Sequence, residues 1–209
     1  MLLLVGKSAS GKSEILKRLK ELGMKTIVTY TTRPPRIGEV EGIDYHFISE
    51  EDFIKKIQSD FFAETTKYET VNGIWRYGSA KEDYDNNTAV ILNPEGLKSV
   101  KRIFPEAIAM YIIASNKTRY ERAISRIKSN DKKGLKEIDR RFEADENDFT
   151  YIHKYVDGVF VNENVKTEED FNRNVEFLLE MYEVLENKLF DGRKEKNGRK
   201  TNILSRRNG

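Results

Sequence analysis

Gly6-Lys7-Ser8-Ala9-Ser10-Gly11-Lys12-Ser13 is the stretch of sequence that decides the fold. It satisfies the pattern G-x4-G-K-[ST] of a phosphate-binding loop (P-loop). The continuous apolar run of residues 1–5 before it predicts a buried strand, and the apolar periodicity after it predicts a helix to about Leu22. A strand, this loop and a helix, in that order, favour nucleoside triphosphate binding over a glycine turn that happens to contain a lysine.

The residue types of the P-loop match the chemistry of a triphosphate. Successive backbone N–H groups point at phosphate oxygens, and the N-terminus of the following helix adds a positive dipole. Lys12 is expected to pair with the β- and γ-phosphates, and the Ser13 hydroxyl is expected to ligate Mg²⁺. We therefore predict that ATP binds all eight residues of the loop. The motif does not identify what receives the phosphoryl group.

Length and composition exclude several other classes of protein. The chain of 209 residues suits one α/β domain with insertions. It has no cysteine and only two histidines, which excludes disulfides and thiolate metal sites and argues against a multi-histidine metal centre. The apolar N-terminal run is too short for a signal peptide, and no apolar run is long enough to span a membrane. We expect a cytoplasmic protein with no membrane partner.

The rest of the chain predicts an α/β fold of the P-loop NTPase type, with a parallel sheet flanked by helices. Further strands are expected at residues 25–30, 89–92, 107–113 and 159–161, and further helices at 95–103 and 167–189. Residues 33–80 are predicted to form a small α+β insert, with a helix at 50–59 capped by Ser49 and strands at 61–66 and 74–77 joined by an Asn72-Gly73 turn. The core then comprises residues 1–32, 81–116 and 150–189.

Residues 117–149 are predicted to form a helical lid, with helices at 117–129 and 135–149. The last segment, 190–209, is basic: seven basic against two acidic residues give it +5, which leaves −3 for residues 1–189. It lacks periodicity, so we expect disorder there. This segment could bind nucleic acid or an acidic partner through counterion release, or act only as a solubilising tail. The body of the chain is not a nucleic-acid-binding surface.

Residues 29–47 predict a site for a second phosphate. Arg33 and Arg36 lie three residues apart in a loop stiffened by Pro34 and Pro35, and arginine offers a planar fork to a phosphate dianion. Tyr45 and Tyr77 could add hydroxyl donors. On chemistry alone, a solvated basic loop explains these residues equally well.

This loop closely resembles the GMP-binding segment of guanylate kinases, whose pattern is T-T-R-x-P-R-x-G-E-x-x-G-x-D-Y-x-F. The resemblance extends over about residues 1–189. It implies ATP-dependent phosphorylation of GMP or dGMP by a monomer or dimer. It also implies an acceptor site made of Thr29, Arg33, Arg36, Tyr45, Glu64, Tyr77, Gly78, Ser79 and Asn93. Of these, Tyr77-Gly78-Ser79 resembles the Y-G-[ST] element of the family, and Thr29 stands at the position of a base-contacting serine.

Glu64 has a clear physical role within this resemblance. Guanine presents N1–H and N2–H as adjacent donors, and one carboxylate can accept both. Adenine has an acceptor at N1, so the same carboxylate would face a lone pair, and leaving buried polar groups unpaired discriminates strongly between ligands. Without the resemblance, Glu64 would be an ordinary exposed carboxylate.

The predicted lid is rich in arginine, and Arg122 and Arg126 share a helix face at i, i+4 spacing. The segment resembles the lid of guanylate kinases, R-x3-R followed by R-[LF]-x2-A, which implies catalytic roles for Arg122, Arg126 and Arg141 beside Lys12. Taken alone, the segment favours a solvated helix face with arginine–glutamate pairs. Val161-Asn162 resembles a V-N element near the adenine pocket, which adds Asn162 to the predicted ATP site.

One segment departs from the family pattern D-x-D-x-Q-G, because here it contains Ile91-Leu92-Asn93-Pro94-Glu95-Gly96. Ile91 removes a carboxylate that would support the Mg²⁺ water shell. Asn93 replaces a base-contacting carboxylate with an amide, which accepts a hydrogen bond without charge. Two alternatives therefore stay open: a kinase for a different phosphorylated acceptor, and an inactive guanylate-kinase-like module that binds phosphorylated peptides. Such modules tend to lose the P-loop, which this chain keeps.

Overall fold

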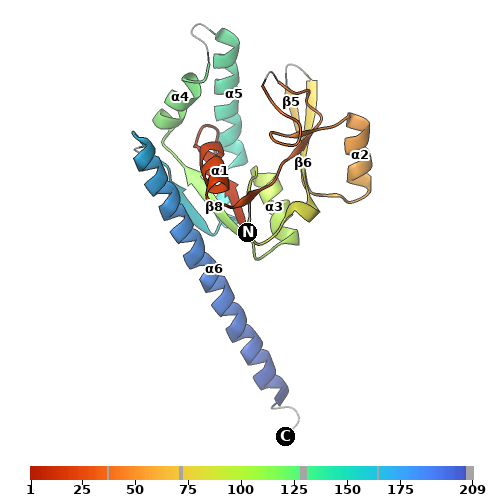
Figure 1. The fold of residues 1–209 in the computed structure, drawn as a ribbon, viewed down its shortest axis with the longest axis vertical. Helices are drawn as coiled ribbons and strands as arrows, with labels where there is room; N and C mark the ends of the chain where they lie inside the picture. The colour runs from red at the N-terminus through yellow and green to blue at the C-terminus, as the bar shows by residue number, and fades with distance from the viewer. Residues whose placement is uncertain (37, 71–72, 128–130, 164, 206–209) are drawn as a thin grey trace. The chain divides into compact units, whose positions relative to one another are not determined.

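The computed structural model describes residues 1–36, 38–70, 73–127, 131–163 and 165–205. The chain divides into two compact units, Met1–Asn164 and Val165–Gly209. The first unit contains the P-loop, the insert and the predicted lid (Figure 1). Asn72, half of the predicted turn, lies outside the described residues.

The main sheet has five parallel strands in the order β2-β7-β1-β8-β9. They are β1 (Leu2–Val5), β2 (Lys25–Thr26), β7 (Thr88–Ile91), β8 (Ile108–Ile113) and β9 (Gly158–Val161). The central strand β1 is completely buried, as its uninterrupted apolar sequence predicts. The predicted α/β fold with a parallel sheet is therefore confirmed.

Helices and short 3₁₀ turns connect these strands. They are α1 (Lys12–Glu21), α3 (Pro94–Ile103), η1 (Lys81–Asp83) and η2 (Ile152–Lys154). The core contains Leu3 and Val5 of β1, Val90 of β7 and Leu97 and Val100 of α3. Helix α3 thus packs one apolar face against the centre of the sheet, which fixes the position of its N-terminus at the sheet edge.

The insert has its own four-stranded sheet, in the order β4-β3-β6-β5. Its elements are β3 (Tyr30–Thr31), β4 (His46–Phe47), α2 (Glu50–Gln58), β5 (Phe62–Thr70) and β6 (Gly73–Ala80). The Ser49 cap of α2 is confirmed, because its hydroxyl accepts a hydrogen bond from the Asp52 N–H at 3.0 Å. Phe53 of α2 stacks on Phe62 of β5 with ring centres 4.6 Å apart, which attaches the helix to the hairpin.

The prediction of a single strand at residues 25–30 is wrong. The structure divides it into β2, which pairs with β7 of the main sheet, and β3, which pairs with β6 of the insert. The local apolar pattern is continuous across this point, so only the tertiary pairing reveals that the chain leaves one sheet for the other. The β5–β6 hairpin is also longer than predicted, since pairing runs from Phe62↔Ala80 to Thr70↔Gly73.

The lid consists of α4 (Asn116–Ile124) and α5 (Lys132–Asp148). Helix α4 ends before residue 129, the predicted end, and residues 128–130 lie outside the described part of the chain. In Figure 1, these two helices and the β5–β6 hairpin with α2 form two separate projections from the first unit.

Helix α6 (Glu168–Ser205) belongs to the second unit. It continues past Leu189, where the sequence analysis ended it, and the disorder expected for residues 190–209 stays a prediction. The stretch from residue 190 to 205 contains no proline and is rich in lysine and arginine, which favour helix even without apolar periodicity. None of the helices in the described part of the chain combines the length and the apolar character needed to cross a membrane.

Candidate active site

The P-loop, Asn93, the start of α4 and Asn162 lie at the carboxyl ends of adjacent parallel strands. The P-loop follows β1, Asn93 follows β7, α4 begins after β8 and Asn162 follows β9. Neighbouring parallel strands end at the same edge of a sheet, and ligands of open α/β sheets bind there. The topology therefore brings the P-loop, the start of the lid and Asn162 together.

Side chains hold the carbonyl groups of the P-loop. Lys12 Nζ donates to the carbonyl oxygens of Gly6 and Lys7 at 2.5 and 3.0 Å. The Ser10 carbonyl accepts from Asn162 Nδ2 at 2.8 Å and from Arg122 Nη1 at 3.3 Å. Asn162 is thus a buried residue that holds the P-loop directly through the Ser10 carbonyl. The sequence analysis placed it in the ATP site only through the resemblance of Val161-Asn162 to a family element.

The N–H groups of the same loop are available to a ligand. Within the described chain, the backbone N–H groups of Gly11, Lys12 and Ser13 have no acceptor, and no side chain caps α1. Gly11 has φ +98°, and a Cβ there would lie 2.2 Å from Asn162 Nδ2, so glycine is required. The Ser13 side chain is exposed. Free amides at a helix N-terminus beside a lysine form an anion-binding site.

Burial lowers the pKa of Lys12 to about 8. The negative charge of Asp145 opposes this effect, while the positive charges of Arg119 and Arg126 add to it. A lysine with this pKa is only partly protonated slightly above neutral pH, when no polyanion is bound. Phosphate oxygens near Nζ would favour the protonated form.

We predict that ATP binding takes up a proton near pH 8. Because the bound phosphates raise the pKa of Lys12, the Kd for ATP should rise between pH 7 and pH 9, by up to about tenfold per pH unit above the free-enzyme pKa. Calorimetry in buffers of different ionisation enthalpy measures the proton uptake. The Lys12→Ala variant should show none of it, and an unchanged Kd across this range in the wild type would contradict the assignment.

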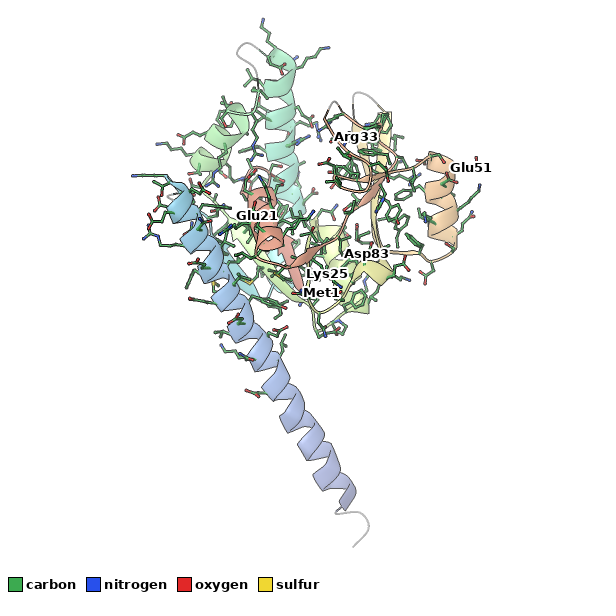
Figure 2. All side chains as sticks on the ribbon, viewed as in Figure 1. Met1, Glu21, Lys25, Arg33, Glu51 and Asp83 are labelled. Atoms are coloured by element: carbon green, nitrogen blue, oxygen red, sulfur yellow. The ribbon has the colours of Figure 1, made fainter. Side chains whose placement is uncertain are left out.

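Arg33 and its partners build the predicted acceptor-phosphate site in the insert. Arg33 is buried and donates from Nη1 and Nη2 to the two carboxylate oxygens of Glu39 at 2.9 and 2.8 Å. Its guanidinium lies 5.3 Å from the ring centre of Tyr45, whose ring meets Tyr77 edge-on at 5.9 Å. Figure 2 shows Arg33 beside the β5–β6 hairpin. The structure therefore brings Arg33, Tyr45 and Tyr77 together.

Glu39 is a residue of this site that the sequence analysis did not assign. Besides binding Arg33, its carboxylate accepts the backbone N–H of Arg36 at 2.7 Å, while the Arg36 side chain is exposed. The hydrogen bond from Arg33 keeps the pKa of Glu39 below its ordinary value. Its position in the G-E step of the quoted pattern was the only clue in the sequence.

Glu64 lies in a buried polar cluster. Its Oε1 accepts the Ser79 hydroxyl at 2.8 Å, and the Ser79 and Tyr84 hydroxyls lie 2.7 Å apart. A Cβ on Gly96 would lie 3.1 Å from Oε2, which places this oxygen beside the N-terminus of α3. Burial raises the pKa of Glu64, and the hydrogen bonds from Ser79 oppose that rise. Tyr84 is a member that the sequence did not reveal.

Gly78 lies in strand β6 of the insert sheet, and Thr29 lies directly before strand β3. A Cβ on Gly78 would lie 3.0–3.1 Å from Phe62, Phe53 and the Glu64 carbonyl, so its absence lets the strands pack closely. Thr29 precedes β3, and its carbonyl accepts the His46 N–H. None of the contacts of Thr29 in the described residues joins it to Glu64, so its predicted contact with the base stays a prediction.

The Asn93 amide is already used within the protein. Its Oδ1 caps α3 by accepting the Gly96 N–H at 2.7 Å, and its Nδ2 donates to Thr66 Oγ1 at 2.9 Å and to Tyr68 OH at 3.1 Å. Both amide hydrogens are therefore occupied, and one lone pair of Oδ1 remains. Thr66, and Tyr68 on the part of β5 beyond the predicted strand, are further residues that the sequence analysis did not assign to the site.

The three predicted catalytic arginines differ in their surroundings. Arg122 contacts the P-loop, and its Nη2 also donates to the Asn162 carbonyl at 3.1 Å. Arg126 is exposed and is close enough to influence the pKa of Lys12. Arg141 donates to Glu137 on its own helix at 2.8 Å, and Glu137 also binds Arg140. Of these three arginines, Arg122 is the one with a hydrogen bond to the P-loop among the described contacts.

Comparisons with known proteins identify the family of this chain. The family model for guanylate kinase matches residues 1–180. The chain is 33% identical over 174 residues to a guanylate kinase of Caldanaerobacter subterraneus, covering 79% of this chain and 80% of that protein. It is 32% identical over 168 residues to one of Fusobacterium nucleatum, covering 77% and 86%.

Among solved structures, the fold is similar to a guanylate kinase from Anaplasma phagocytophilum, with a TM-score of 0.61 and 21% identity over 87% of this chain and 85% of that one. The likeness to this structure concerns the fold, while the family match rests on the sequence comparisons. The chain belongs to the guanylate kinase family and is a nucleotide-binding phosphotransferase of that type.

Proposed function

We propose that the chain transfers the γ-phosphoryl group of ATP to the phosphate of GMP or dGMP. The bond between the γ-phosphorus and the bridging β–γ oxygen breaks, a bond to an acceptor phosphate oxygen forms, and ADP and GDP or dGDP leave. The observation that carries this proposal is the pairing of two sites: a P-loop with free amides, and a half-buried carboxylate, Glu64, beside Asn93 at the end of the neighbouring strand β7.

The donor site follows from the P-loop geometry. The free N–H groups of Gly11, Lys12 and Ser13 would hold the phosphates, and Lys12 would neutralise charge on the β- and γ-phosphates. Arg122 already touches the loop. Arg126 and Arg141 would approach the transferring group when the lid closes, with Arg141 exchanging Glu137 for phosphate. Phosphoryl transfer depends mainly on such positioning and on charge.

The acceptor site would bind GMP from two sides. Arg33 and Arg36, with the Tyr45 and Tyr77 hydroxyls, would hold its phosphate, while Glu39 keeps the Arg33 fork in place. Glu64 would accept the guanine N1–H and N2–H. Ser79 fixes one oxygen of this carboxylate, so its plane is set before the base arrives.

The residues present fit Mg²⁺ that is bound together with the nucleotide. The described residues contain no group of three or more acidic or histidine side chains that could hold a metal by themselves. Mg²⁺ is commonly bound by few protein ligands plus substrate phosphates, and the exposed Ser13 hydroxyl beside the free amides suits that arrangement. When bound, the ion would supply positive charge to the β- and γ-phosphates.

A second candidate is a kinase for a different phosphorylated acceptor. The contacts of Asn93 favour this second candidate. Thr66 and Tyr68 occupy both amide hydrogens of Asn93, and the Asn93 side chain carries no charge. A base other than guanine could therefore meet a different set of polar groups here. An inactive module for phosphorylated peptides is disfavoured by the complete P-loop.

An acceptor panel tests the proposal and separates it from these alternatives. ADP release from ATP and Mg²⁺ would be followed with GMP, dGMP, IMP, AMP, CMP, UMP and dTMP. We expect turnover with GMP, dGMP or both. Turnover with another nucleotide alone would support the second candidate. No turnover with any acceptor, in a protein that binds ATP or GMP, would contradict the proposal and favour the binding module or a non-nucleotide acceptor.

A further inference from the structure

A buried ion pair lies next to the P-loop and has no part in the site as predicted from sequence. Arg119 of α4 is 1% exposed and Asp145 of α5 is 8% exposed, and Arg119 Nη2 lies 2.6 Å from Asp145 Oδ2. Burying two charges is unfavourable, because both lose their hydration, unless further hydrogen bonds satisfy them. The other partners of this pair are therefore informative.

Both members of the pair bind the main chain of Ser8, the third residue of the P-loop. Arg119 Nε donates to the Ser8 carbonyl at 2.8 Å, and the Ser8 N–H donates to Asp145 Oδ2 at 2.7 Å. Two further contacts fix the guanidinium: Nη1 donates to Asn116 Oδ1 at 3.0 Å, and the group lies 4.3 Å from the ring centre of Phe142. The pair thus clamps Ser8 from both sides.

The residue that follows Ser8 explains why a clamp is needed. Ala9 has φ +60°, in the left-handed region, which is sterically unfavourable for a residue with a Cβ. Such a conformation persists only where the surroundings hold it. The Ser8 carbonyl belongs to the peptide that enters Ala9, so the hydrogen bond from Arg119 sets the orientation of that peptide. The free amides of Gly11, Lys12 and Ser13 come next in the loop.

We propose that Arg119 and Asp145 are positioning residues for the triphosphate: they hold the Ser8–Ala9 segment so that the following amides face the phosphates. Because they belong to α4 and α5, they also link the position of the lid helices to the conformation of the P-loop. The proposal rests on the proposed function only in taking ATP as the ligand of the P-loop. According to this proposal, Arg119 and Asp145 contribute to ATP binding whether or not the predicted catalytic arginines of the lid touch the nucleotide.

The test measures binding of each substrate separately, so that no turnover is needed. The main variant is the double substitution Arg119→Met with Asp145→Ala, because replacing a buried ion pair by apolar groups is often neutral for stability. Arg119→Lys and Asp145→Asn are the conservative single variants. Glu143→Gln, an exposed carboxylate on the same helix, is the matched control. Calorimetry gives the Kd for ATP with Mg²⁺ and, in a second titration, the Kd for GMP, and thermal unfolding gives the melting temperature.

We expect the double variant to bind ATP about 10- to 100-fold more weakly, as for the loss of groups that orient a binding residue. Its Kd for GMP and its melting temperature should stay close to those of the wild type, because the acceptor contacts lie in the insert. The conservative variants should fall between. Unchanged ATP affinity in the folded double variant, or equal losses for ATP and GMP, would overturn the proposal. A wild type that binds ATP but does not phosphorylate GMP would refute the proposed function and leave this measurement decisive for positioning.

Discussion

Lys12→Ala should lower kcat for phosphoryl transfer by about 10³-fold, the cost typical of removing one charge-stabilising donor from a transition state. Lys12 Nζ contacts the Gly6 and Lys7 carbonyls of the loop. The free N–H groups of the loop begin at Gly11, one residue before Lys12. The positive charge of Lys12 would stabilise the charge that shifts toward the β–γ bridging oxygen as that bond breaks. Initial rates at saturating ATP and GMP give this value.

The same substitution removes three internal hydrogen bonds, to the Gly6 and Lys7 carbonyls and the Ser10 hydroxyl, so loss of structure must be separated from loss of chemistry. Lys17→Ala removes an exposed lysine from the same helix and is the matched control, which should keep the wild-type rate. Thermal unfolding of both variants reports on the fold. A folded Lys12→Ala variant that keeps kcat within about threefold of the wild type, a small part of the expected loss, would show that the P-loop lysine is not part of the reaction.

Glu64→Gln should lower kcat/KM for GMP by about 10³-fold or more, because a glutamine presents an N–H group where guanine presents its own donors. Hydrogen bonds to charged groups contribute about 1.5–3 kcal/mol each, and two of them are lost. In addition, buried donors would face one another, which discriminates strongly. The Ser79 hydroxyl, 2.8 Å from Oε1, holds the carboxylate and leaves little freedom to avoid this conflict.

Glu69→Gln on the same strand is the control for this substitution, because the Glu69 side chain is exposed and pairs only with Lys67 among the contacts described for it. It should leave kcat/KM unchanged. ATP affinity, measured without acceptor, should be the same in both variants, since the P-loop lies outside the insert. A Glu64→Gln variant with wild-type kcat/KM for GMP would remove the main argument for guanine recognition.

The P-loop and the main sheet could be predicted from sequence because their determinants are local. Eight consecutive residues define the loop, and an uninterrupted apolar strand and an amphipathic helix flank it. The Ser49 cap is likewise a short-range feature. The resemblance of residues 29–47 to a known segment then identified Arg33, Tyr45 and Tyr77, which the structure brings together.

The remaining features depend on contacts between distant residues. The division of residues 25–30 between two sheets is set by pairing with β7 and β6. The Arg119–Asp145 pair joins positions 26 residues apart on two charged helices, where many other pairings are conceivable. Asn93 looked like a base-contacting residue, but capping of α3 and the longer β5 strand use most of its hydrogen-bonding capacity. A local pattern cannot reveal which partner a polar side chain finds.

The central claim is that a phosphoryl group passes from ATP to GMP, and transfer of label tests it most directly. ATP labelled in the γ-phosphate would be incubated with GMP, Mg²⁺ and the protein, and the products separated by chromatography, with the Lys12→Ala variant as the blank. The account predicts label in GDP and little in free phosphate, with none above background in the blank. Label that appears only as free phosphate, or that stays in ATP with none in GDP, would contradict it.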